Sequence, residues 1–198
     1  MTAPRRAWVV VVLMTMVGVA AAVWVVPSAR SRAAVEVLPR SMHCGRHAVP
    51  YRIIDTTTDV PHPAFDVTLR PDSFCQLEIT FVNTGSRTVH LDTATFPGMG
   101  AARAGSGGPL EITQNGGRFT QRDSGTTEDG DAVLPIDEDL DPDGSISMLF
   151  DLRTRASAFL GMPGRSVGYE DVPAVRLSAG HLPGTIHGSV DLRIREER

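Results

Sequence analysis

The chain has 198 residues, with 23 acidic residues, 19 arginines, no lysine and a formal net charge of −4. Beyond Glu36 it carries 15 arginines against 22 acids, a net charge of −7, which argues against the basic patches that bind nucleic acid or anionic lipid. We therefore expect no nucleic-acid partner. Arginine without lysine is typical of a high-GC bacterial genome. The length allows one ordinary domain after the N-terminal segment, and 19 glycines and 14 prolines argue against long helices in it.

The N-terminal part of the chain is strongly hydrophobic. Residues 7–26 form an uncharged stretch of 20 residues, which as a helix would extend roughly 30 Å, the thickness of a bilayer's hydrocarbon core. Trp8 and Trp24 lie near its two ends, where indoles favour the headgroup region. We expect residues 1–6 to be cytoplasmic, residues 7–26 to be a transmembrane helix or uncleaved signal anchor, and residues 27–40 to be a stalk.

A cleaved signal peptide is the alternative interpretation of the same stretch. The small-x-small pattern that a signal peptidase needs is poorly matched, at Val26-Pro27-Ser28 or Pro27-Ser28-Ala29. The short N-terminus and the long remainder predict that the C-terminal part is exported. We therefore expect an extracytoplasmic domain at residues 41–198, either anchored as a single-pass protein of the cell membrane or secreted after cleavage.

The two cysteines, Cys44 and Cys75, both lie in the exported part. An even number of cysteines in an oxidising compartment predicts a disulfide. Two buried free thiols are the alternative.

Short alternating runs separated by turn residues predict strands throughout residues 41–198. The clearest run is Phe74–Val82, in which apolar residues alternate with polar ones, as a half-buried antiparallel strand requires. We interpret this strand and Thr88–Leu91 as a β-hairpin around the turn Asn83–Ser86. The further predicted strands are Tyr51–Ile54, Phe65–Leu69, Leu110–Thr113, Ala132–Ile136, Ser145–Leu152, Ala174–Leu177 and Thr185–Ile194. Together they predict a mostly β fold, a single antiparallel β-sandwich preceded by one N-terminal transmembrane helix.

One stretch of the predicted sandwich resembles a known kind of domain. The run Cys75–Gly85, followed by Val89–Leu91, resembles the adjacent strands of bacterial telokin-like and other immunoglobulin-like exported domains. Those domains also tend to have an acidic Pro-Gly turn before an apolar strand, as Asp141–Gly144 precedes Ser145–Phe150. The resemblance implies an immunoglobulin-like sandwich used for stability, adhesion or partner contact, and it transfers no catalytic residues. The exported part departs from the pattern in having no tryptophan to pack on a sandwich disulfide.

An acidic segment offers a candidate metal site. Residues 123–143 hold nine acids and no basic residue, and Asp139, Asp141 and Asp143 match the first half of a calcium loop, D-x-D-x-D-G. An EF-hand is excluded because its twelfth position falls on Phe150, where a bidentate glutamate belongs. A calcium loop of another kind, with Asp137 or Asp151 added, and a solvated acidic turn remain the two interpretations.

Histidines near the first cysteine suggest a softer metal. His43, Cys44 and His47, with Met42 or Met99, could bind copper or zinc. If Cys44 forms a disulfide, this set loses its thiolate ligand.

The segment Gly164–Gly168 matches the nucleophile-elbow pattern G-x-S-x-G around Ser166. Asp171 and later histidines follow in the order of a catalytic triad. The flanking Pro163 and Pro173 argue against the strand and helix that this elbow needs, so we interpret the segment as a loop.

These observations favour a non-catalytic, membrane-anchored interaction or accessory module of the bacterial cell envelope. The membrane is its first expected partner, through the N-terminal helix, and another envelope protein is the second. The alternative function is an exported ligand or metal binder that uses calcium or copper.

Overall fold

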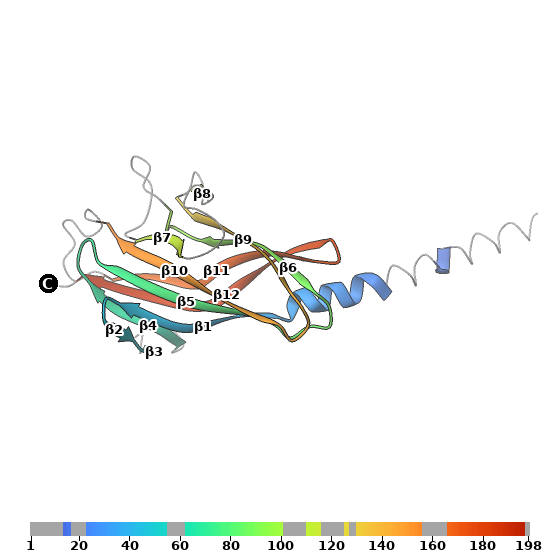
Figure 1. Cartoon of the computed structure of the whole chain (residues 1–198), viewed down its shortest axis with the longest axis horizontal. Helices are drawn as coiled ribbons and strands as arrows, with labels where there is room; N and C mark the ends of the chain where they lie inside the picture. The colour runs from blue at the N-terminus through green and yellow to red at the C-terminus, as the bar shows by residue number, and fades with distance from the viewer. Residues whose placement is uncertain are drawn as a thin grey trace, which may run out of the picture.

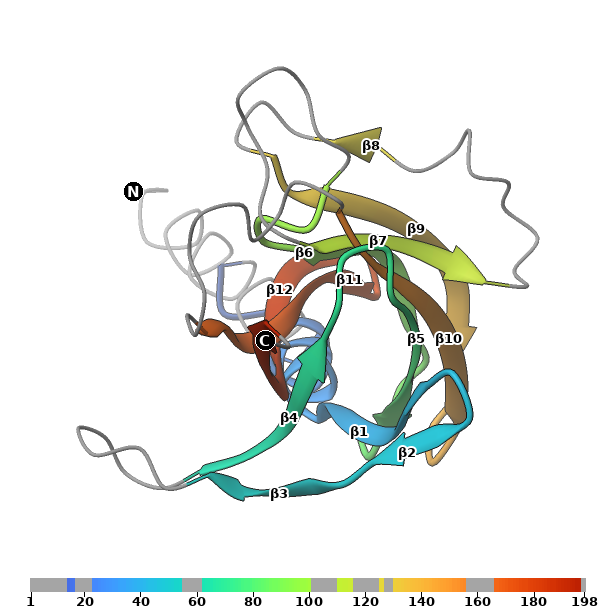
Figure 2. The same cartoon turned by 90° about the vertical axis from the view of Figure 1, so that its left-hand side faces the viewer.

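The computed structural model describes residues 14–16, 23–54, 62–100, 110–115, 125–126, 130–155 and 166–196. Its strands form two sheets, so the predicted mostly β fold is confirmed (Figures 1 and 2). The five-stranded sheet contains, in spatial order, β2 (His47–Val49), β1 (Val35–Cys44), β5 (Phe74–Asn83), β10 (Ser145–Thr154) and β7 (Leu110–Asn115). The seven-stranded sheet contains β3 (Tyr51–Ile54), β4 (His62–Leu69), β12 (Leu182–Glu196), β11 (Ser166–Ala179), β6 (Val89–Phe96), β9 (Ala132–Leu140) and β8 (Gly125–Thr126).

The two sheets enclose one hydrophobic core, an arrangement consistent with a β-sandwich. In β5 the side chains of Cys75, Leu77, Ile79 and Phe81 are all fully buried, as the period of two predicts. The opposite sheet contributes Phe96, whose ring lies 5.0 Å from that of Phe150 in β10, edge to face. Such an aromatic pair adds about 0.5–1.5 kcal/mol to the free energy of burial.

One strand pair corrects the prediction of a purely antiparallel sandwich. Strand β12 pairs with β4 in parallel, with Leu192 opposite Phe65 and Ile194 opposite Val67. The other strand pairs among the described residues are antiparallel. Alternation of apolar and polar residues is the same in both kinds of strand, so it could not distinguish them.

The predicted hairpin between β5 and β6 is wrong. Strand β5 pairs with β1 and β10, whereas β6 pairs with β11 and β9 in the other sheet. The segment after Asn83 therefore crosses from one sheet to the other. The segment Asp141–Gly144 makes a second crossing, between β9 and β10. Asn and Gly favour a turn in either arrangement, and packing of the two apolar faces decides that these turns connect the sheets.

The first cysteine is bonded to the second, as predicted. Cys44 in β1 lies directly opposite Cys75 in β5, and the two form a disulfide with a Cα–Cα distance of 4.1 Å. Neither cysteine is free.

The N-terminal segment differs from the expected stalk. Residues 14–16 and 23–33 are helical. The rest of the membrane span predicted at residues 7–26 lies outside the described residues. Within the described part of the chain, no helix is long and apolar enough to cross a membrane. Strand β1 begins at Val35, so the boundary predicted at residue 41 is too late. The buried Val35 and Val37 explain why this segment joins the sheet.

Candidate functional site

The end of the domain nearest the N-terminal helix is organised by one buried asparagine. The Asn83 side chain is fully buried, and its amide nitrogen donates to the carbonyl oxygens of Leu140 at 2.9 Å and Asp141 at 3.1 Å. Its backbone nitrogen donates to Gly144 O at 2.9 Å. Its side-chain oxygen accepts from Gly85 N at 2.9 Å. Asn83 therefore joins the two crossings between the sheets into one unit.

The helix of residues 23–33 packs against this unit. Trp24, Ser28 and Ser31 are spaced by four and three residues and so share one helical face. Ser28 and Ser31 are only 0% and 1% exposed. Figure 1 shows the helix lying at the same end of the domain as the tip of the β11–β12 hairpin and the two crossings.

Small residues of the domain make this close approach possible. A Cβ atom built on Gly85 would lie 2.8 Å from Ser31 Cα, closer than real Cβ atoms come to a backbone. A Cβ atom on Gly180, at the hairpin tip, would lie 3.0 Å from Ser28 Oγ and 3.5 Å from the Trp24 ring. We call the surface formed by Gly85, Gly180 and their neighbouring turn residues the helix cradle.

Polar contacts fasten the helix in the cradle. Arg87 donates to Ser28 Oγ at 3.1 Å, and Arg32 donates to the Pro183 carbonyl oxygen. Just after the helix, Ala34 O accepts from both the backbone nitrogen and the hydroxyl of Thr84, at 2.9 and 2.8 Å. These contacts come from the segment after Asn83 that crosses between the sheets and from the β11–β12 hairpin. The helix is therefore held by several parts of the domain.

The sequence predictions did not identify the cradle. The sequence patterns place Trp24 at the membrane interface and Ser28 and Ser31 in the stalk. The helical spacing of small residues at positions 28 and 31 is a signal of close helix packing that could have been used. The positions of their partner glycines, more than 50 residues away, depend on the tertiary structure.

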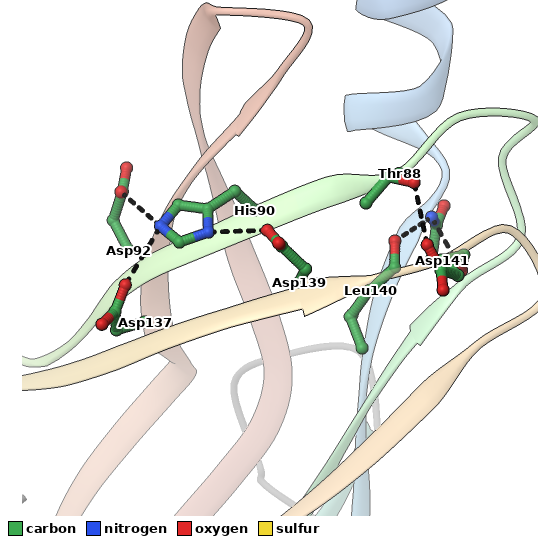
Figure 3. Close-up of polar contacts among 8 residues, drawn as sticks. Thr88, His90, Asp92, Asp137, Asp139, Leu140 and Asp141 are labelled. Carbon is green, nitrogen blue, oxygen red and sulfur yellow. Dashed lines mark hydrogen bonds and ion pairs between the residues drawn. The ribbon is translucent and has the colours of Figure 1, made fainter.

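The three aspartates of the predicted calcium loop do not converge. Asp139 lies in β9 and contacts His90 Nδ1 at 2.8 Å, and Asp141 accepts from the Thr88 hydroxyl at 2.9 Å (Figure 3). Asp143 lies in the turn with φ of 58°, and its backbone nitrogen donates to Asn83 O. Among the described residues, no group of three or more His, Cys, Asp or Glu side chains could hold a metal ion. The carboxylates instead support the turn and the β6–β9 pair.

Acidic side chains of this region surround His90 on the outer surface of the seven-stranded sheet. Its Nε2 lies 3.3 Å from Asp92 and 3.5 Å from Asp137, on the ring side opposite Asp139 (Figure 3). A β-bulge between β6 and β9 and the left-handed conformation of Asp137, with φ of 49°, place these side chains together. When protonated, His90 donates from both ring nitrogens to carboxylates, a surface network of modest energy.

The other predicted sites are placed as follows. His43 lies in β1 and His47 in β2, with Cys44 committed to the disulfide, so the copper or zinc set has no thiolate. Met99 is fully buried in the hydrophobic core. Ser166 begins strand β11, which corrects the interpretation of this segment as a loop, and Gly164 lies outside the described residues.

Comparisons with known proteins give no family. No protein-family model matches the chain, and no curated protein does. Among solved structures, the chain is similar to the ASH/PapD-like domain 7 of human CEP192, at 12% identity and a TM-score of 0.39, covering 87% of this chain and 88% of that one.

Two further solved structures have comparable likeness. A CBM3b carbohydrate-binding module from cellobiohydrolase 9A of Clostridium thermocellum has 13% identity and a TM-score of 0.35, covering 78% of this chain and 96% of that one. A family 123 glycoside hydrolase from Clostridium perfringens has 7% identity and a TM-score of 0.37, covering 83% of this chain and 28% of that one. At these TM-scores, the likenesses carry no argument about family, ligand or activity.

Proposed function

We propose that this chain is a membrane-anchored, extracytoplasmic module of the bacterial cell envelope, with an immunoglobulin-like sandwich and a non-catalytic role in contacting another envelope protein. The observation that carries the proposal is the packing of residues 23–33 in the helix cradle. This helix includes the last four residues of the hydrophobic stretch 7–26. A helix that continues from the bilayer into the cradle would hold the domain directly at the membrane surface.

The same contacts favour an uncleaved anchor over a cleaved signal peptide. Both candidate cleavage sites, Val26-Pro27-Ser28 and Pro27-Ser28-Ala29, fall within the docked helix. A peptidase needs an extended and accessible backbone, whereas Ser28 is fully buried and its hydroxyl donates to Trp24 O at 2.9 Å. Cleavage after position 28 or 29 would also remove Trp24 and Ser28 from the cradle.

The anchoring function supports a specific orientation of the domain. Strand β5 runs from Phe74 to Asn83, and Asn83 lies at the cradle. Ten residues of strand span roughly 30 Å, so Phe74 lies at the far end of the domain. With the cradle at the membrane, this distal end would face away from the bilayer, where a partner has access.

The test is the N-terminus of the mature protein. The full chain, carrying a C-terminal tag, is purified from the membrane fraction of a bacterial host, and its intact mass is measured. We expect the mass of the uncleaved chain, resistance to carbonate extraction, and digestion of the domain by protease added outside spheroplasts. A variant with Val26→Ala, Pro27→Gln and Ser28→Ala, which offers an Ala-x-Ala site, shows that a processed form would be detected. A mature N-terminus between residues 27 and 31 in the unaltered chain would overturn the anchor.

A further inference from the structure

The distal end of the domain carries a pocket that shares only Asp151 with the residues considered for the predicted sites. Its volume is about 360 Å³, and it lies on the outer face of the five-stranded sheet. Its lining residues are Asp72, Phe74, Glu111, Thr113, Asp151 and Arg153.

Strand register places these side chains together. Phe74 of β5 lies opposite Arg153 of β10, and Arg153 lies opposite Glu111 of β7, which makes one row across three strands. Thr113 and Asp151 form the adjacent row. Their chain neighbours Cys75, Leu152 and Ile112 are buried in the core, so the side chains of both rows point outward.

One wall of the pocket is the turn at residues 70–73, which is fixed in place. The hydroxyl of the buried Thr154 donates to Arg70 O at 2.7 Å and accepts from Ser73 N at 2.8 Å. The backbone nitrogen of Thr154 donates to Ser73 O at 3.0 Å. These bonds hold Asp72, with φ of 59°, at the rim. These bonds fix this wall of the pocket without a ligand, and largely preformed walls are typical of small-molecule sites.

The chemistry of the lining selects one class of ligand. The lining contains three carboxylates, Asp72, Glu111 and Asp151, and a single guanidinium, Arg153. Phe74 is 48% exposed at the edge of the pocket, so its ring is accessible to a bound ligand. An aromatic face beside an excess of carboxylates attracts a cation that also has apolar surface.

We propose that this pocket binds an organic cation, an ammonium or guanidinium group on an apolar stem. The Phe74 ring packs on the stem and attracts the charge, and Asp72 and Asp151 accept hydrogen bonds from it. Thr113, opposite Asp151 on the neighbouring strand, adds a hydroxyl to the lining. The ligand is either a free amine or the basic side chain of an extracytoplasmic protein. The proposal deepens the interaction role proposed above and relies on it only for the direction in which the pocket faces.

The experiment compares matched ligands on the full chain in detergent micelles by titration calorimetry at low salt. The probes are Nα-acetyl-arginine methylamide, its uncharged isostere Nα-acetyl-citrulline methylamide, and agmatine. We expect the arginine probe to bind at least about fivefold more tightly than the citrulline probe and to weaken as salt is raised. If agmatine binds as tightly as the capped arginine, the site takes free amines. If the capped arginine binds more tightly than agmatine, the site takes a peptide.

Variants then locate the binding. Asp72→Asn removes one charge and suits the left-handed backbone, so it should weaken the arginine probe by about two- to fivefold without affecting folding. Phe74→Leu keeps an apolar side chain but removes the ring, with a similar expected loss. Asp143→Asn is the matched control, because Asp143 has nearly the same φ, 58°, at the opposite end of the domain.

Three results would overturn the proposal. The first is that neither cation binds at about 1 mM. The second is that the arginine and citrulline probes bind equally well. The third is that Asp143→Asn weakens binding of the arginine probe as much as Asp72→Asn does. Because the domain is studied in detergent with the chain intact, none of these results depends on whether a host cleaves the N-terminal helix. Failure here would leave the anchor proposal standing, and processing of the anchor would leave the pocket proposal standing.

Discussion

Gly85 and Ser31 lie so close together that no other residue fits at position 85 without a shift. A Cβ atom there would lie 2.8 Å from Ser31 Cα and 3.0 Å from the Asn83 side-chain oxygen. The first atom belongs to the helix backbone, which has little freedom to move. This contact links the helix to the crossing between the two sheets.

Gly85→Ala should therefore release the helix from the cradle. Overpacking of this kind costs about 1–3 kcal/mol, and most of the cost falls on the helix–domain contact because the shortest approach is to the Ser31 backbone. The expected result is faster hydrogen exchange in residues 28–34, with a smaller change in the strands, measured on the full chain in detergent by mass spectrometry.

Gly168→Ala is the control for this change. A Cβ atom on Gly168 meets nothing within 4 Å, and the residue lies in strand β11. We expect no loss of stability, and a gain of up to about 1 kcal/mol, since alanine restricts the unfolded chain. Equal exchange of residues 28–34 in the two variants would show that the helix does not depend on the cradle.

Asn83→Ala should destabilise the whole domain. Its amide supports the carbonyls of Leu140 and Asp141, and truncation leaves buried polar groups without partners. The cost for such a group is about 1–3 kcal/mol, measured as the free energy of unfolding in urea. Gln76→Ala is the comparison, because that amide makes a longer 3.3 Å bond to Asp151 near the surface. Similar losses in both variants would contradict the role of Asn83.

Removal of the disulfide should cost about 3–4 kcal/mol on the chain-entropy model, since Cys44 and Cys75 are separated by 31 residues. The double variant Cys44→Ser and Cys75→Ser, unfolded in urea beside the oxidised chain, measures this loss. Thiol titration of the denatured, unreduced chain should find no free thiol. Two free thiols would refute the disulfide directly.

The raised pKa values of the two tyrosines lead us to predict a loss of stability at alkaline pH. Burial raises the pKa of Tyr169 to about 12, against smaller opposing effects of the Leu110 backbone and the Arg155 charge. Burial also raises the pKa of Tyr51, with the Asp191 carboxylate adding to the effect. An unfolded tyrosine loses its proton near pH 10, so the unfolded state binds fewer protons than the folded state between about pH 10 and 12. Stability is then greatest below pH 10 and falls as pH rises through this window.

Absorbance at the phenolate band provides the measurement, because Tyr51 and Tyr169 are the only tyrosines in the chain. Both should ionise above pH 10 in the folded protein, Tyr169 near 12. Tyr169→Phe should remove the later step and reduce the loss of stability across the window. Ionisation of both groups at pH 10 in folded protein would contradict the burial argument.

Most of the strand positions could be predicted from the sequence, but their neighbours could not. Phe74–Val82 was recognised because its alternation shows directly which side chains face a core. The same alternation does not say which strand lies beside it, so the sequence predicts a hairpin at the turn after Asn83, where the chain crosses between the sheets. The sequence does not predict the edge strand β2, because its three residues are partly or fully exposed and show no alternation of apolar and polar side chains.

The sequence by itself determined the mostly β fold, the pairing of the two cysteines and the hydrophobic N-terminal stretch, because these depend on local patterns and on a count of two. Only the tertiary structure decided that Ser28 and Ser31 pack in a cradle of distant turns, that Asp139 contacts His90 and not a shared ion site, and that Phe74 and Asp72 line one pocket. Each of these depends on contacts between residues far apart in the chain. Such contacts arise from sheet order and register, which a local period does not specify.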